Sequence, residues 1–333
     1  MKKIKAGVAL IAAILSVQYL APMSSLAAPA TVSLPSGMNL GSTSFYDGFG
    51  GKPGESAWQV YLGHTDYKGS KDNHGDDIPV FNDPKLKVSV LINQYSHLFD
   101  TETKYLGGHP GIDLILPLVH LDADFDSGPP FPALSLDDAS GVKFGDPTVS
   151  LFLQYDPIMV NGNPVFASRV NAGFTIPTGA YDKHKDINMG NNHWSFSAYW
   201  AMTLFLSPKW SISLRPTYYY NFKNTDPASS APLDTEIQDI QAGQSFSTNY
   251  NIAYRVNDVL SIGLNGYYLK QLTDDKVNDS RLKDSREQSF AVGPGAMLDY
   301  GNDKFYLTAQ RESSVENRFE ADSSFTLRWL RIF

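Results

Sequence analysis

The sequence of 333 residues contains no cysteine. Disulfide bonds therefore contribute nothing to its fold, and the chain is not a lipoprotein acylated on cysteine. Basic charge is also scarce, because 27 Lys and Arg stand against 35 Asp and Glu and give a formal net charge of −8. Nucleic acid is excluded as a partner, since phosphate binding needs a basic stripe and the Lys and Arg here are scattered. Beyond Leu20 no apolar run reaches the roughly 20 residues of a membrane-spanning helix.

The amino terminus has the layout of a secretory signal. Three lysines within the first five residues precede an apolar run from Ala6 to Leu20, and small residues follow up to Ala28. A membrane anchor is the competing interpretation, but the run is shorter than the roughly 20 apolar residues of a spanning helix. We therefore expect residues 1–28 to be a cleaved signal peptide that exports the chain.

A period of two runs through the rest of the sequence. From Ser245 to Val256, apolar or aromatic residues alternate with small polar residues and one arginine. This period indicates a strand with one apolar and one polar face. The alternation recurs from Trp58 onward in segments of about ten or more residues, whereas strands of soluble domains usually run about five or six. We therefore predict an all-β fold, a transmembrane antiparallel up-and-down β-barrel, with a soluble β-sandwich as the alternative.

The links between these segments are of two kinds. Long polar links alternate with short ones such as Pro208–Lys209 and Asn257–Asp258. Longer external loops that alternate with short periplasmic turns are typical of a barrel with both termini inside, which requires an even number of strands. We expect twelve strands, and ten or fourteen stay open because two of the expected turns, Asp100–Pro110 and Pro157–Pro164, are long.

The expected barrel is a single domain, residues 57–333, preceded by an amino-terminal segment, residues 29–56. Pro35–Gly54 in that segment is rich in glycine and aromatic residues, and it either folds into the lumen as a plug or lies in the periplasm. The twelve strands are expected at residues 57–67, 85–99, 111–121, 147–156, 165–177, 193–207, 210–222, 242–256, 259–271, 286–300, 304–312 and 321–333.

Energetic cost decides which face of each strand meets lipid. Arg215 alternates with Leu214, and an arginine that faces lipid near the bilayer middle costs about 2 to 4 kcal/mol. Arg215 is therefore expected in the lumen. The same alternation assigns to the lumen, as a candidate substrate pathway or a filled interior, a mixed polar set: Arg169, Asn171, Tyr199, Arg215, Tyr219, Asn249, Asn251, Arg255, Asn265, Tyr267 and His193. Rings near strand ends are expected in interfacial girdles: Trp58, Tyr61, Trp194, Trp200, Trp210, Tyr220, Phe222, Tyr268 and Trp329.

The last strand carries a pattern of its own. Phe325, Leu327, Trp329 and Phe333 occupy every second position, and only Arg331 breaks the series. The pattern resembles the terminal strand of bacterial outer-membrane proteins. The resemblance implies that the barrel-assembly machinery recognises the strand ending in Phe333, and that the chain lies in the bacterial outer membrane.

Several motifs resemble those of one known family. They are Gly190–Phe196 (GNNHWSF), Gly266–Lys276 (GYYLKQLTDDK), Ser285–Gln288 (SREQ), Gly293–Ala296 (GPGA), Phe144–Pro147 (FGDP) and Ile176–Asp182 (IPTGAYD). With them, most of the chain after the signal is similar to the outer-membrane family of the meta-pathway of phenol degradation, which includes sphingosine-induced outer-membrane proteins. The resemblance implies a barrel that takes up aromatic or other hydrophobic compounds, with no catalytic residues.

One pair of residues suggests an enzyme instead. His193 and Ser195 are two positions apart on an expected strand and so share a face, and a histidine can act as the general base for a serine hydroxyl. This spacing resembles the His and Ser of outer-membrane phospholipases. In those lipases the pair faces lipid, whereas Trp194 and Phe196 claim the lipid face here. A lumen histidine near the external rim is the competing and favoured interpretation.

Three aspartates suggest a cation. Asp122, Asp124 and Asp126 alternate, and hard cations such as calcium take several carboxylate oxygens. However, Gly128 comes one place late for a calcium-binding EF-hand loop, and Ala133 stands where that loop needs a glutamate. A solvated external rim is the favoured interpretation, so we expect no metal and no cofactor.

These observations predict an outer-membrane channel or transporter for hydrophobic or aromatic, phenol-like or amphiphilic, compounds. The expected partners are those small molecules, outer-membrane lipid and lipopolysaccharide. We expect no enzymatic activity. Two alternatives stay open, a lipid hydrolase that uses His193 and Ser195 and a binding or structural barrel that transports nothing.

Overall fold

The computed structural model describes residues 34–35, 37–78, 85–124, 141–185, 187–227 and 237–333. These residues form strands joined by turns and loops, and among them no helix is long and apolar enough to cross a membrane. The strands in chain order are β1 (Ser56–Ser70), β2 (Lys85–Leu98), β3 (His109–Asp124), β4 (Gly141–Phe144), β5 (Thr148–Gln154), β6 (Ile158–Val160), β7 (Asn163–Thr175), β8 (Ser195–Phe205), β9 (Trp210–Asn221), β10 (Ile240–Gln241), β11 (Ser245–Arg255), β12 (Leu260–Gln271), β13 (Lys276–Val277), β14 (Ser280–Arg281), β15 (Gln288–Tyr300), β16 (Asp303–Glu316) and β17 (Phe319–Ile332).

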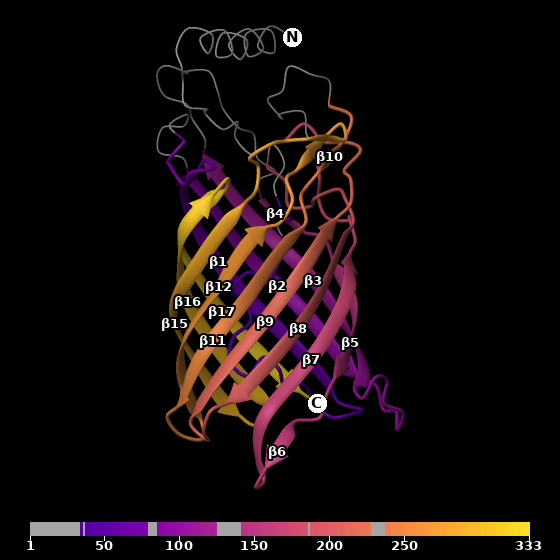
Figure 1. Cartoon of the computed structure of the whole chain (residues 1–333), viewed down its shortest axis with the longest axis vertical. Helices are drawn as coiled ribbons and strands as arrows, with labels where there is room; N and C mark the ends of the chain where they lie inside the picture. The colour runs from indigo at the N-terminus through magenta and orange to yellow at the C-terminus, as the bar shows by residue number, and fades with distance from the viewer. Residues whose placement is uncertain (1–33, 36, 79–84, 125–140, 186, 228–236) are drawn as a thin grey trace, which may run out of the picture.

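The long strands close into a barrel (Figure 1). Each pairs antiparallel with its neighbours along the chain, and β1 closes the sheet by pairing with both β2 and β17. Because β4 and β5 both pair with β3, they make one wall strand in two pieces, and the wall has twelve strands. Closure leaves no open sheet edge, which a membrane requires. The predicted antiparallel β-barrel of twelve strands is confirmed.

The interruption between β4 and β5 has a local cause. In the ladder Leu118 lies opposite Phe144 and Ile115 lies opposite Thr148, so three residues of one strand face two of the other. Such a bulge suits Pro117, which has no N–H for the ladder. The Gly145 N–H still donates to the Pro117 carbonyl at 3.0 Å and keeps the wall continuous. The expected external link before residue 147 was therefore too long, because residues 141–144 belong to the wall.

The two ends of the barrel differ as the link lengths predict. The carboxyl terminus, the short turns and the small strand β6 lie at one end in Figure 1. The long links lie at the other end, where β10, β13 and β14 form a separate three-stranded sheet. We call these the short-turn end and the loop end. In outer-membrane barrels short turns face the periplasm and longer loops face outward, so the loop end corresponds to their external end.

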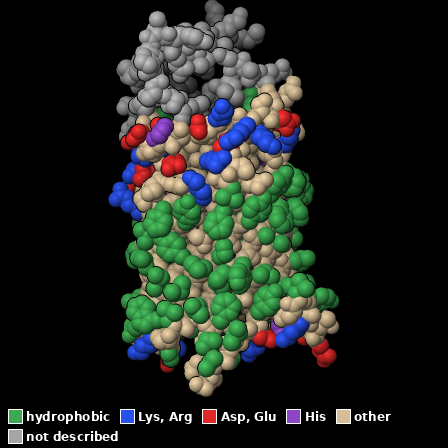
Figure 2. Space-filling model, in the orientation of Figure 1, with side chains coloured by type: hydrophobic (Ala, Val, Ile, Leu, Met, Phe, Trp, Pro, Cys, Tyr) green, Lys and Arg blue, Asp and Glu red, His purple; other side chains and the backbone are tan. Residues whose placement is uncertain are grey.

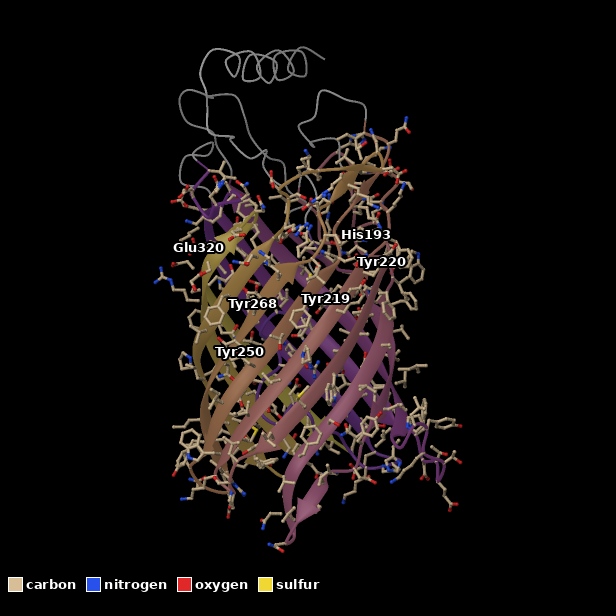
Figure 3. All side chains as sticks on the ribbon, in the orientation of Figure 1. His193, Tyr219, Tyr220, Tyr250, Tyr268 and Glu320 are labelled. Atoms are coloured by element: carbon tan, nitrogen blue, oxygen red, sulfur yellow. The ribbon has the colours of Figure 1, made fainter. Side chains whose placement is uncertain are left out.

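The outer surface carries a belt of apolar side chains below a band of charged ones (Figure 2). The alternation produces this belt directly, since Leu214 is 38% exposed while its neighbour Ser213 is 1% exposed. Figure 3 labels another such pair, Tyr219, which is buried, and Tyr220, which is partly exposed. One girdle prediction is wrong: Tyr61 is buried, and its hydroxyl donates to Gln59 and Gln94 inside the barrel.

Candidate functional site in the barrel lumen

A segment of the chain before β1 runs through the inside of the barrel. We call residues 34–35 and 37–55 the lumen segment. At the loop end Leu34 packs against Leu269 of β12, and its N–H donates to the Glu287 carboxylate at 2.9 Å. At the short-turn end the Gly54 N–H donates to the Leu98 carbonyl at 2.8 Å, next to the start of β1. The segment thus contacts the wall at both ends of the barrel.

Amide side chains hold the upper part of the lumen segment. Asn249 of β11 accepts a hydrogen bond from the Gly41 N–H at 2.9 Å, and its Nδ2 donates to Asn39 and Thr43 at 2.9 and 2.7 Å. Gln310 of β16 donates to the Gly41 carbonyl at 3.1 Å. The two contacts to Gly41 replace hydrogen bonds that its buried backbone would otherwise lose on leaving water.

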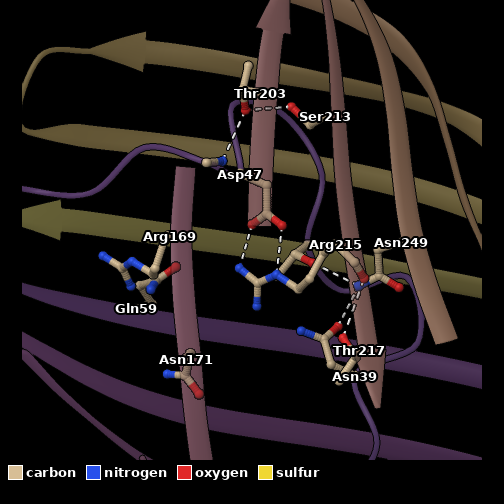
Figure 4. Close-up of polar contacts among 12 residues, drawn as sticks. Asn39, Asp47, Gln59, Arg169, Asn171, Thr203, Ser213, Arg215, Thr217 and Asn249 are labelled. Carbon is tan, nitrogen blue, oxygen red and sulfur yellow. Dashed lines mark hydrogen bonds and ion pairs between the residues drawn. The ribbon is translucent and has the colours of Figure 1, made fainter. Parts of the chain in front are cut away.

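An ion pair anchors the middle of the lumen segment. Arg215 Nε and Nη2 donate to the two carboxylate oxygens of Asp47 at 2.7 and 2.6 Å, a bidentate contact that Figure 4 shows inside the barrel. Both side chains are largely buried, at 13% and 7% exposure. Charge-assisted bidentate pairs are among the strongest polar contacts in proteins. The predicted lumen arginine therefore holds the segment, and it also stacks 4.2 Å from the Tyr199 ring centroid.

Apolar contacts complete the anchoring. Phe45 is 1% exposed and packs against Ala253, Met297 and Tyr306 of three wall strands. Just beyond it, the Gly48 N–H donates to Thr203 Oγ1 at 3.0 Å, and Gln154 donates to the Gly48 carbonyl at 3.0 Å. The segment therefore touches both β11, β15 and β16 and, across the barrel, β5 and β8.

The structure places the predicted lumen residues inside the barrel. Seven are buried: Asn171, Tyr219, Asn249, Asn251, Asn265, Tyr267 and His193. Arg169, Tyr199 and Arg215 are partly buried, and Arg255 reaches solvent at the short-turn end and pairs with Asp258 at 3.0 Å. Asn249 and Arg215 meet through the lumen segment, whereas Tyr267 lies higher and bonds to Glu312.

Sequence reasoning missed several lumen residues. Asp113 of β3 is 1% exposed and bonds to Ser96, Asn171 and, at 3.8 Å, Arg169. Arg328 of β17 is buried against the ring of Tyr306. The signal was present in the alternation, because Arg328 lies between the outward residues Leu327 and Trp329.

A cavity opens beside the lumen segment at the short-turn end. Its volume is about 400 Å³, and residues of the short turns such as Pro208 and Asp258 line it. The aromatic wall includes Tyr46, whose ring stacks on Phe205 with centroids 5.6 Å apart. The polar wall combines carboxylates, amides and phenols with Arg169, Arg215, Arg255, Arg328 and Lys304.

His193 and Ser195 do not have the geometry of a catalytic pair. His193 Nδ1 lies 3.0 Å from the Trp194 carbonyl oxygen, so this nitrogen carries the proton and donates. Ser195 Oγ donates to Asn221 Oδ1 at 3.0 Å and lies 3.4 Å from His193 Nδ1. Burial lowers the pKa of His193. Both side chains are buried at the loop end, where Figure 3 labels His193.

Buried carboxylates lie in the loops that cover the loop end. Asp275 Oδ1 accepts hydrogen bonds from the Gly243 N–H at 2.8 Å and from Gln271 Nε2 at 2.7 Å. Burial raises the pKa of Asp275 to about 7. Burial also raises the pKa of Glu287, which binds the Leu34 N–H and lies 3.7 Å from Arg318. The loop end therefore contains groups that titrate closer to neutral pH than ordinary carboxylates do.

The suggested calcium site cannot be followed through the described residues. Asp126 and the loop Ser127–Leu136 lie outside them, as does the expected signal peptide, and Asp122 is exposed. Across the described ranges, no group of three or more His, Asp or Glu side chains is placed to hold a metal ion.

Comparison with protein families identifies the chain. The model of the family described as "Putative MetA-pathway of phenol degradation" matches residues 68–329, which include every wall strand at least in part. The chain belongs to this family. The resemblance of its motifs to the phenol-degradation family is thereby confirmed. Comparison with curated proteins gives no match.

One solved structure confirms the fold of this member of the phenol-degradation family. It is similar to the COG4313 outer membrane channel from Pseudomonas putida F1, with a TM-score of 0.68 and 20% identity over 87% of this chain and 98% of that one. It is more distantly similar to the β-domain of the Bordetella autotransporter BrkA, with a TM-score of 0.47 and 11% identity over 84% of this chain and 100% of that one. The fold is that of an outer-membrane β-barrel.

Proposed function

We propose that the protein is an outer-membrane channel for hydrophobic or aromatic compounds and that the lumen segment controls its opening. The observation that carries the proposal is a lumen lined by arginine, tyrosine and amide side chains and occupied by a segment held there by noncovalent contacts, such as the pair Asp47–Arg215. The interior of a twelve-stranded barrel is intermediate in width between filled eight-stranded barrels and open sixteen-stranded porins, so a single extended segment of the chain can close it. The family description supports phenolic compounds as substrates.

Conductance across a planar bilayer tests the proposal. We expect few openings from the refolded protein and large, stable openings from a variant whose mature chain begins at Gly51, because this variant lacks the anchors at Asn249 and Arg215. Phenol and long-chain amphiphiles added to the bath should then reduce the current. If the correctly folded truncated barrel conducts no ions, the channel function is wrong and a binding or structural barrel is the better description.

We propose further that the protein is not an enzyme. The Ser195 hydroxyl donates to Asn221, and His193 Nδ1 donates to a backbone carbonyl and so cannot accept the serine proton. A serine-directed fluorophosphonate should therefore leave Ser195 unlabelled in lipid-saturated protein, and labelling that Ser195→Ala abolishes would overturn this statement.

The remaining partners follow from the ends and surface of the barrel. We infer that residues 1–28 direct export and are cleaved, and that the assembly machinery recognises β17 and Phe333. Near the loop end Lys68, Lys85 and Lys87 line a groove together with Asp66 and Asp322, and Lys68 pairs with Asp322 at 3.6 Å. We infer that the excess of lysine there favours contact with the phosphates of lipopolysaccharide. Mass spectrometry of the mature protein should give an amino terminus next to Ala28.

A further inference from the structure

Arg328 is a buried cation enclosed by tyrosine rings. It belongs to β17, is 5% exposed, and its guanidinium carbon lies 3.6 Å from the Tyr306 ring centroid and 5.7 Å from that of Tyr61. An arginine is charged at all accessible pH values, so burial does not make it neutral. Its charge needs a partner in the barrel.

The other arginines inside the barrel have carboxylate partners. Arg215 pairs with Asp47 at 2.6 Å, Arg169 approaches Asp113 at 3.8 Å, and Arg318 lies 3.7 Å from Glu312. Arg328 forms no ion pair with any residue in the described part of the chain, and its Nε is buried without a hydrogen-bond partner there. Tyr306 and Tyr61 act on it more strongly than Asp47 does, and Arg215 already binds both oxygens of the Asp47 carboxylate.

Arg328 lines the cavity at the short-turn end. Five cationic side chains and three carboxylates share the lining, and each of these carboxylates already has a cation: Asp47 has Arg215, Asp258 has Arg255 at 3.0 Å, and Asp299 has Lys304 at 2.6 Å. Two cations are left, Arg169 and Arg328. Arg169 approaches Asp113 outside the lining at 3.8 Å, so the uncompensated positive charge of the lining lies at Arg328. The volume of about 400 Å³ is within the range of small-molecule pockets.

The apolar part of the lining limits what the anion can be. Phe45, Met297, Leu330 and the ring of Tyr306 line the same cavity as Arg328. An inorganic anion would leave these apolar surfaces exposed to water. A planar ring with one carboxylate would bury them and still present two oxygens to the parallel N–H groups of a guanidinium.

We propose that Arg328 is the centre of a binding site for small organic anions with an apolar ring, of which aromatic carboxylates are the simplest. The carboxylate accepts hydrogen bonds from the guanidinium, including the unpartnered Nε, and the ring packs beside Tyr306 and Met297. The site faces the short-turn end, so a bound ligand has already passed the lumen segment. This inference rests on the proposed channel function for the route of the ligand, whereas binding itself is tested without transport.

Isothermal titration of the refolded protein in detergent with benzoate tests the site. Benzyl alcohol serves as the neutral ring probe and sodium formate as the anion without a ring, each with an empty-micelle blank. We expect benzoate to bind at least about tenfold more tightly than either probe. Arg328→Met should weaken benzoate binding by about tenfold or more, because it removes the charge and keeps the length of the side chain.

Arg331→Met is the matched control. Arg331 lies three residues further along β17, is 55% exposed, pairs with Asp303 and is absent from the cavity lining. The Arg331→Met variant should bind benzoate as the unsubstituted protein does. If Arg328→Met folds poorly, Arg328→Lys replaces it in the test; because this variant keeps the charge, it should retain part of the affinity for benzoate. Equal binding of benzoate and benzyl alcohol, equal loss in Arg328→Met and Arg331→Met, or no benzoate binding by folded protein would overturn the site. Benzoate binding without any conductance would leave the site standing and remove the channel.

Discussion

At the scale of single residues, Gly48 of the lumen segment lies directly against the backbone of the wall. A Cβ atom at this position would lie 2.2 Å from the Ala167 carbonyl oxygen and 2.6 Å from the Thr203 nitrogen. Both are backbone atoms of wall strands and cannot rotate away. Overpacking of this kind typically costs about 1 to 3 kcal/mol. Gly48→Ala should therefore loosen the segment and increase the fraction of time that single channels are open.

Gly37→Ala provides the comparison for this prediction. Apart from its chain neighbours, no described residue has an atom within 4 Å of the Cβ position at Gly37, which belongs to the same segment. Its open fraction should equal that of the unsubstituted protein in the same bilayer. Equal open fractions for both variants and the unsubstituted protein would mean that the segment does not control the conductance.

Asp275 gives the loop end a dependence on pH with a definite sign. Its pKa is raised from 3.8 to about 7, so between these values the closed loops hold a proton that opened loops release. A group with a raised pKa stabilises the folded state at low pH, and this contribution is lost as pH rises toward 7. Trypsin should therefore cleave the loop after Arg281 or Lys283 faster at pH 8 than at pH 5.5, relative to an unfolded substrate.

Asp275→Asn should remove most of this dependence. Its side-chain oxygen still accepts from Gly243 and Gln271, and no charge develops as pH rises. Asp284→Asn changes an exposed carboxylate of the same loop and should keep the dependence of the unsubstituted protein. The neighbouring carboxylate Glu287 shifts in the same direction, so the dependence should weaken rather than vanish. If the ratio of the cleavage rate at pH 8 to that at pH 5.5 is the same for Asp275→Asn and Asp284→Asn, this account is wrong.

At the scale of elements, the position of a strand residue relative to lipid decides its tolerance. Leu214, near the middle of β9, is 38% exposed on the lipid belt, and an arginine there costs about 2 to 4 kcal/mol. Val256, just after β11 near the short-turn end, is 42% exposed, and an arginine near the interface costs about 0 to 1 kcal/mol. In urea unfolding from lipid vesicles, Leu214→Arg should lower the free energy of unfolding more than Val256→Arg does. Similar decreases for the two variants would place residue 214 outside the bilayer.

The alternation of residue types was sufficient to predict the wall. A strand that faces lipid on one side and the lumen on the other must alternate, so the faces of β9 and β11 could be read from sequence, and the twelve strands followed from link lengths. Tyr61 was misplaced because tyrosine is stable both in a girdle and in a polar lumen. Gly141–Phe144 was missed because four residues are too few to show a period.

The lumen segment shows where sequence patterns stop being informative. Pro35–Gly54 has no period, because its contacts do not repeat: Asn39, Asp47 and Gly48 bind three different wall strands, β11, β9 and β8. Asp47 and Arg215 are separated by 168 positions, and their pairing depends on the closure of the barrel. The position of Arg328 could be predicted from its neighbours. Its lack of a counter-ion among the described residues could not, since that depends on which carboxylates already pair with other cations.

At the scale of the whole molecule, the lumen segment is part of the same chain as the wall, but only noncovalent contacts hold it inside the barrel. The segment continues into β1 and so cannot diffuse away, although its contacts with Asn249, Arg215 and Thr203 can break. If the channel opens when these contacts break, its opening should depend on movement of the segment and not on any rearrangement of the wall. The absence of native cysteine makes this dependence accessible to cross-linking.

Cross-linking distinguishes a route through the lumen from a route around it. Thr43 Oγ1 and Asn249 Nδ2 lie 2.7 Å apart, so Thr43→Cys with Asn249→Cys can be bridged by oxidation or by a short bifunctional thiol reagent. The bridge should abolish single-channel openings and uptake of phenolic solutes, and reduction of a disulfide bridge should restore both. Thr65→Cys with Ser324→Cys is the matched control, because these hydroxyls lie 3.0 Å apart between β1 and β17 and join wall to wall. Its bridge should leave conductance unchanged, since the wall is already closed there by the β1–β17 ladder. If solute uptake continues through the barrel bridged at 43 and 249, the solutes enter without displacing the segment, and the route must be sought in the wall.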